Sequence, residues 1–136
     1  MKRRESEFQT RLNRWSKHFW KTLPRDEFGS ALVECKVSKT KSLAYSAVSD
    51  KQVRNLTLAN EGFFNHTFSD FDRMGTPADC VFLHESNAFV AIQFWRPRNK
   101  EFFLIPIQEW ITEVETSDRK SLTECRARDI GHKFTF

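Results

Sequence analysis

Apolar residues near the start of the chain recur at helical spacing. Phe8, Leu12, Trp15 and Phe19 follow one another at intervals of four, three and four residues. Such intervals place the four side chains on one stripe of an α-helix. The pattern therefore predicts a helix over residues 5–20 that packs this stripe inward.

Two further helices are predicted from capping signals. Gln52 follows Ser49 by three residues, which is the pattern of a capping box. The apolar residues that come next recur on one helix face: Val53, Leu56 and Ala59. Glu124 follows Ser121 at the same spacing and predicts a short closing helix that ends at Gly131.

Runs of β-branched and aromatic residues predict strands. Five runs have strand length: 31–37, 63–68, 80–83, 88–95 and 102–107. The polar residues 84–87 indicate a hairpin between the third and fourth runs, and Pro106 indicates that the last strand lies at an edge. Residues 38–47 and 70–78 are polar or contain glycine and proline, so we expect loops there.

The order of these elements favours an α/β fold, with a mixed central sheet flanked by helices in a single domain over residues 1–136. The 14 Phe and 4 Trp among 136 residues supply enough bulk for a core. No apolar run approaches the roughly 20 residues of a membrane span, and the basic N-terminus lacks the apolar core of a signal peptide. The three cysteines are odd in number and widely spaced, so we expect reduced structural thiols, no zinc module and a cytoplasmic protein.

Charge is uneven along the chain. Residues 1–41 hold 11 Lys or Arg and 5 Asp or Glu, whereas residues 42–136 hold 11 and 13. Clustered cations suit a polyanion such as DNA or RNA, although a solvated helix face has the same composition. The candidate nucleic-acid-binding residues are Lys39, Lys41, Arg11, Arg14 and Lys17.

The strand at residues 31–37 contains a Glu-x-Lys pair. Because side chains alternate along a strand, Glu34 and Lys36 share one face while Cys35 lies on the other. A carboxylate that holds a divalent cation, beside a lysine that offsets charge on a phosphate, suits metal-assisted phosphodiester cleavage. The same pair also fits an ordinary ion pair on an exposed strand face.

Three sequence runs together resemble a known family: "VECKVSKTKSLAYSAVSDKQVRNL", "TPADCVFL" and "FVAIQFW". They are similar to the RecU-like, Holliday-junction-resolvase branch of the PD-(D/E)xK nuclease superfamily, closest to small phage-type members, over roughly residues 5–110. The resemblance implies a restriction-endonuclease-like fold and a Mg²⁺- or Mn²⁺-dependent endonuclease. It further implies branched or recombining DNA as substrate, a homodimer, and the host cytoplasm as the location of a phage-encoded enzyme.

The resemblance also implies residue roles. Glu34 and Lys36 match the acidic residue and the lysine of the motif, and Gln52 matches a glutamine on the following helix that is oriented towards the active site. Glu7 matches a first-helix glutamate that contributes to the metal site. The alternatives without a functional role are that Gln52 only caps its helix with Ser49 and that Glu7 is a solvated carboxylate.

The second metal-binding acid departs from the family pattern. The pattern expects an aspartate on the strand before Glu-x-Lys, where this chain has only Asp26, in a turn eight residues before Glu34. Asp79, at the start of a later strand, is the preferred candidate because a strand holds a ligand more rigidly than a turn. Asp79 as an ordinary strand start remains the alternative.

Two other functions stay open. One is a nucleic-acid-binding protein that has the same fold but no catalytic activity. The other is a protein-interaction domain whose basic helix docks on an acidic partner.

Overall fold

The structure is a computed structural model that describes residues 2–22, 31–61, 63–67, 80–84 and 87–136. Side chains are described within 3–15, 32–61 and 87–136. The helices in these segments are α1 (Lys2–Thr22), η1 (Tyr45–Ala47, a 3₁₀ turn), α2 (Asp50–Glu61), α3 (Ile107–Thr116) and α4 (Glu124–Ile130). The strands are β1 (Ala31–Ser38), β2 (Ser42–Ala44), β3 (Phe63–Thr67), β4 (Cys80–His84), β5 (Asn87–Phe94), β6 (Glu101–Pro106), β7 (Ser121–Thr123) and β8 (His132–Thr135).

The central sheet has the strand order β1-β5-β6-β8. β1 pairs with β5 in parallel along its whole length, from Ala31 opposite Asn87 to Ser38 opposite Phe94. β5 pairs with β6, and β6 with β8, in antiparallel fashion. The fold is therefore α/β with a mixed sheet packed against helices, which confirms the fold class expected from the order of elements.

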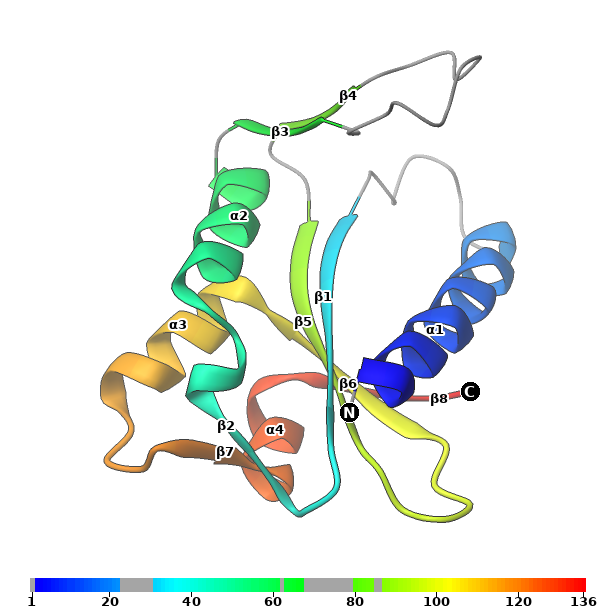
Figure 1. Cartoon of the computed structure of the whole chain (residues 1–136), viewed down its shortest axis with the longest axis vertical. Coiled ribbons are helices and arrows are strands. Elements are labelled where there is room, and N and C mark those ends of the chain that lie inside the picture. Colours follow the sequence, from blue (N-terminus) through cyan, green and yellow to red (C-terminus); the bar gives the residue numbers. More distant parts are fainter. Residues whose placement is uncertain (1, 23–30, 62, 68–79, 85–86) are drawn as a thin grey trace.

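Helices cover both faces of this sheet (Figure 1). On one face, α1 buries Phe8 and Leu12 against Val37 and Phe102. The Phe8 and Phe102 rings meet edge to face with their centroids 5.9 Å apart, a favoured aromatic geometry. The apolar stripe of the first helix is thus confirmed as a core-facing surface over its described side chains.

On the opposite face, α2, α3 and α4 enclose the larger core cluster. Its largest fully buried side chain is Trp110 of α3. The other members include alternate residues of the central strands and the inner faces of the helices: Leu56, Ala59, Ala88, Val90, Ile92, Phe94, Phe103, Ile105, Ile107 and Ala127. β1 is a terminal strand of this sheet, and its residues alternate between the two layers, with Leu32 in the larger cluster and Val33 in the cluster at α1.

Two strand assignments differ from the sequence prediction. β4 pairs with β3, whereas β5 pairs with β1 and β6, so the expected hairpin between β4 and β5 is wrong. The prediction of a loop over residues 38–47 is also wrong, because β2 within this segment pairs with β7, about eighty residues later. β5 pairs with the distant β1, and β2 pairs with the distant β7. Local composition does not specify pairing between segments so far apart in sequence.

The C-terminal third contains elements that the sequence pattern did not indicate. α3 and β8 were not expected, and β6 is an inner strand although Pro106 indicated an edge. Pro106 fits because it pairs only with β5, while β8 reaches no further than Leu104. The closing helix α4 is confirmed, with its end at Gly131, but Thr123 caps it by accepting the backbone N–H of Arg126.

None of the helices in the described segments is both long enough and apolar enough to cross a membrane.

Candidate active site at the edge of the sheet

Glu34 and Lys36 form an ion pair on β1. Lys36 Nζ lies 3.2 Å from Glu34 Oε1, and their side chains are 13% and 28% exposed respectively. Both residues lie on the α2 side of the sheet, since Val33, Cys35 and Val37 alternate with them and pack towards α1. The ion pair of the alternative interpretation is therefore present, but its side chains are partly buried and not fully exposed.

Gln52 joins this pair from the first turn of α2. Its side-chain Nε2 donates a hydrogen bond of 2.7 Å to Glu34 Oε1. Its Oε1 accepts the backbone N–H of Ser49 at 2.9 Å, and Ser49 Oγ accepts the backbone N–H of Gln52 at 3.2 Å. The helix cap and the contact to Glu34 are thus both present, and the cap holds the amide against the carboxylate.

A second carboxylate, from Glu5 of α1, lines a cavity that Glu34 also lines. Glu5 and Glu34 line the same cavity of about 290 Å³, together with Ser6, Gln9 and Cys35. Burial, and to a lesser extent the negative charges of Glu34 and Glu5, raise the pKa of the Cys35 thiol to about 12. Cys35 therefore stays a neutral thiol beside the two carboxylates.

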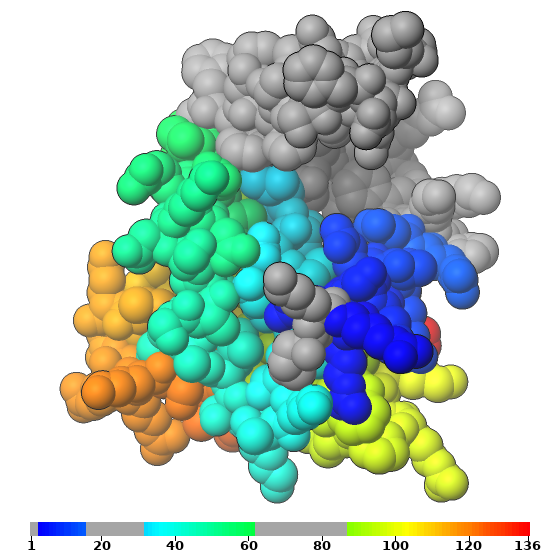
Figure 2. Space-filling view, in the orientation of Figure 1, coloured from blue at the N-terminus to red at the C-terminus, as the bar shows by residue number. Residues whose placement is uncertain are grey.

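The space-filling view shows where these elements meet. Atoms of β1 and the segment after it form a strip between α2 and the N-terminal part of α1 (Figure 2). Glu34 lies on β1, Gln52 on α2 and Glu5 on α1, so three elements contribute to one edge of the sheet.

Glu7, which the resemblance matches to a first-helix glutamate of the metal site, does not line this cavity. Its side chain is 61% exposed and forms an ion pair with Arg3 at 3.2 Å, one helical turn away. Glu5 was missed, although its position contains a usable signal. Glu5 precedes Phe8 by three residues and Leu12 by seven, so it continues the inward stripe of α1, whereas Glu7 does not.

Only some of the remaining predicted acids and cations lie within the described part of the chain. Asp79 and Asp26 lie outside the described residues, as do the side chain of Lys17 and the expected loop 70–78. Among the side chains that are described, no group of three or more His, Cys, Asp or Glu residues is placed to hold a metal ion. The other candidate cations are all exposed: Arg11, Arg14, Lys39 and Lys41.

The donor set at the edge of the sheet fits a hard divalent cation. Mg²⁺ and Mn²⁺ prefer carboxylate oxygens and keep several water ligands, so two carboxylates at an open cavity suit them. Both side-chain contacts to Glu34 are made through Oε1, and no hydrogen bond or ion pair to its Oε2 occurs among the described residues. Glu34 and Glu5 are therefore the residues that would hold the cation.

Comparison with known proteins gave no relative for this chain: no protein-family model, no curated protein and no solved structure matches it.

Proposed function

We propose that this protein is a magnesium-dependent endonuclease that cleaves DNA phosphodiester bonds, with branched or recombination-intermediate DNA as its substrate. The observation that supports this proposal most strongly is the arrangement around Glu34. A lysine and an amide contact one oxygen of that carboxylate, while a second carboxylate, from Glu5, lines the adjoining cavity.

Each residue of the arrangement has a distinct task. Bound Mg²⁺ supplies a polarising charge on the phosphate and lowers the pKa of a water ligand. Glu34 and Glu5 bind and orient that cation, and Gln52 fixes the Glu34 carboxylate through its amide. Lys36, whose ammonium is 3.2 Å from Glu34, offsets the negative charge that grows on the phosphate.

The DNA substrate is supported by charge. The first 41 residues have six more cations than anions, and the exposed Lys39 and Lys41 directly follow β1. Neutralising backbone phosphates is the main source of affinity for nucleic acid. Resolution of a branched substrate needs two symmetric cuts, so the proposal includes a homodimer acting in the cytoplasm.

A cleavage assay with a matched variant tests the proposal. Labelled linear duplex, a flap and a four-way junction are incubated with wild type and with Glu34→Gln in Mg²⁺ or in EDTA. We expect Mg²⁺-dependent cuts by wild type, strongest on the junction, and a loss of at least 100-fold in Glu34→Gln. If wild type binds the junction but does not cut it, the protein is a DNA-binding protein of the same fold and not a nuclease.

A further inference from the structure

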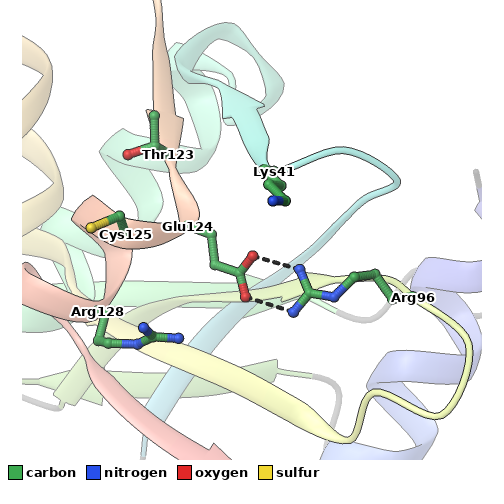
Figure 3. Close-up of a pocket in the computed structure, with 6 residues that line it drawn as sticks. All are labelled: Lys41, Arg96, Thr123, Glu124, Cys125 and Arg128. Carbon is green, nitrogen blue, oxygen red and sulfur yellow. Dashed lines mark hydrogen bonds and ion pairs between the residues drawn. The ribbon is translucent and has the colours of Figure 1, made fainter.

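A second cavity lies beyond the C-terminal end of β1, away from Glu34. Its volume is about 650 Å³, and it is formed by the segment after β1, the turn between β5 and β6, and the start of α4 (Figure 3). Six residues line it: Lys41, Arg96, Thr123, Glu124, Cys125 and Arg128.

An ion pair on the cavity wall fixes one of its cations. Arg96 Nη1 and Nη2 donate to the two oxygens of Glu124 at 2.6 and 2.8 Å, in a bidentate pair. The hydrogen bonds from Arg96 lower the pKa of the Glu124 carboxyl, and the charges of Arg128 and Lys41 lower it further. Glu124 is therefore ionised at neutral pH, and Arg96 is its ion-pair partner among the described residues.

The other two cations have no such neutralising partner. Neither Lys41 nor Arg128 forms an ion pair within the described part of the chain. Three cations and one carboxylate leave the cavity with two positive charges in excess. The position of Lys41 is fixed because its backbone carbonyl accepts the N–H of Glu124 at 2.8 Å.

The excess positive charge of the cavity suits a phosphate, which is negatively charged and whose oxygens accept hydrogen bonds. An arginine and a lysine that face one hollow can share the oxygens of one phosphodiester, and charge-assisted bonds of this kind are the strong ones. Four residues of extended strand separate Glu34 from Ser38 at the end of β1, which is about 13 Å. At about 3.4 Å per nucleotide along one strand, this corresponds to roughly four nucleotides.

We infer that this cavity binds a backbone phosphate of the DNA a few nucleotides away from the bond that is cut. The inference rests on the proposed function, because it takes DNA as the occupant. Lys41 and Arg128 bind the phosphate, while Glu124 holds Arg96 at the rim and opposes the incoming negative charge. Removing Glu124 should therefore strengthen DNA binding, although it breaks an ion pair of the folded protein.

Variants with opposite expected signs test the inference. Binding of a labelled duplex is measured in Ca²⁺ across a series of salt concentrations for wild type, Glu124→Gln, and Lys41→Gln combined with Arg128→Gln. A charge-matched control combines Arg119→Gln with Lys120→Gln, in the turn at the opposite end of the β2–β7 pair from Lys41. Thermal melting checks that every variant is folded.

The double variant of the cavity should bind at least tenfold more weakly at low salt, with a salt slope smaller by about one to two. Glu124→Gln should bind about threefold more tightly, and the control should behave as wild type. Equal affinities and slopes for wild type and the Lys41/Arg128 variant would overturn the inference alone. Absence of any DNA binding by wild type would overturn the proposed function and the inference together.

If Glu124→Gln does not fold, the Lys41/Arg128 variant still decides the question, because neither of its side chains has an ion-pair partner among the described residues.

Discussion

Gln52 donates its side-chain amide to Glu34 Oε1 at 2.7 Å while its carbonyl oxygen accepts the Ser49 backbone N–H at 2.9 Å. One side chain therefore caps α2 and fixes the orientation of the carboxylate on β1. A cap alone would contribute only stability, whereas the contact to Glu34 links the first turn of α2 to the candidate active site.

The two tasks of Gln52 are separable by mutation. Ser49→Ala removes the cap from the other side and should lower the free energy of unfolding by about 1 kcal/mol with cleavage unchanged within about twofold. Gln52→Met removes the amide and should lower stability by a similar amount and cleavage by about tenfold, or 1.4 kcal/mol. Urea unfolding and a nicking assay measure both quantities. Equal nicking by the two variants would leave Gln52 as a cap only.

Lys36 should matter for both cleavage and stability. Lys36→Met leaves the partly buried Glu34 carboxylate without its cation, so we expect a loss of about 1–2 kcal/mol in the free energy of unfolding. Cleavage should fall at least 100-fold, while DNA binding in Ca²⁺ stays within about threefold of wild type.

Lys133→Met is the matched control for Lys36. It breaks an exposed ion pair with Glu101 and should change stability by less than about 0.5 kcal/mol. If Lys36→Met cleaves at the wild-type rate, in preparations free of contaminating nuclease, the lysine has no part in the reaction.

Glu5 and Glu7 form a matched pair two residues apart on α1. Glu5→Gln removes a carboxylate from the cavity beside Glu34, so the Mg²⁺ concentration for half-maximal cleavage should rise at least tenfold. Glu7→Gln removes only the partner of Arg3 and should leave that concentration within about twofold. Cleavage measured across a Mg²⁺ series separates them, and the reverse order would restore Glu7 to the metal site.

Asp79 and Asp26 remain the rival candidates for a further acidic ligand. We expect Asp79→Asn to weaken Mg²⁺ binding and cleavage at least tenfold, because the sequence predicts a strand start at Asp79 and a turn at Asp26, and a strand start fixes a side chain better. Asp26→Asn should change both by less than about threefold. Calorimetric titration of Mg²⁺ beside a nicking assay compares the two variants, and a larger effect of Asp26→Asn would assign the ligand to the segment before Glu34.

Local patterns predicted the elements that are defined by their own residues. The stripe from Phe8 to Trp15 identified α1, the Ser49/Gln52 spacing identified α2, and alternation placed Glu34 and Lys36 on one face. Each of these features depends on residues that are close in sequence, so periodicity and capping rules suffice.

Features that depend on distant partners were not predicted. The pairing of β2 with β7, the inner position of β6 and the cavity shared by Glu5 and Glu34 all arise from tertiary packing. The cavity at Lys41 combines that residue with segments more than fifty residues later in the chain, and its charge excess follows only from the structure.

The central claim, that Glu34 binds a divalent cation, is tested most directly by calorimetric titration of Mn²⁺ into wild type and Glu34→Gln at the same pH and salt concentration. Mn²⁺ takes the same oxygen ligands as Mg²⁺. We expect one site per chain in wild type and at least a tenfold loss of affinity in Glu34→Gln, with both proteins folded. Identical titration curves for the two proteins would contradict the claim.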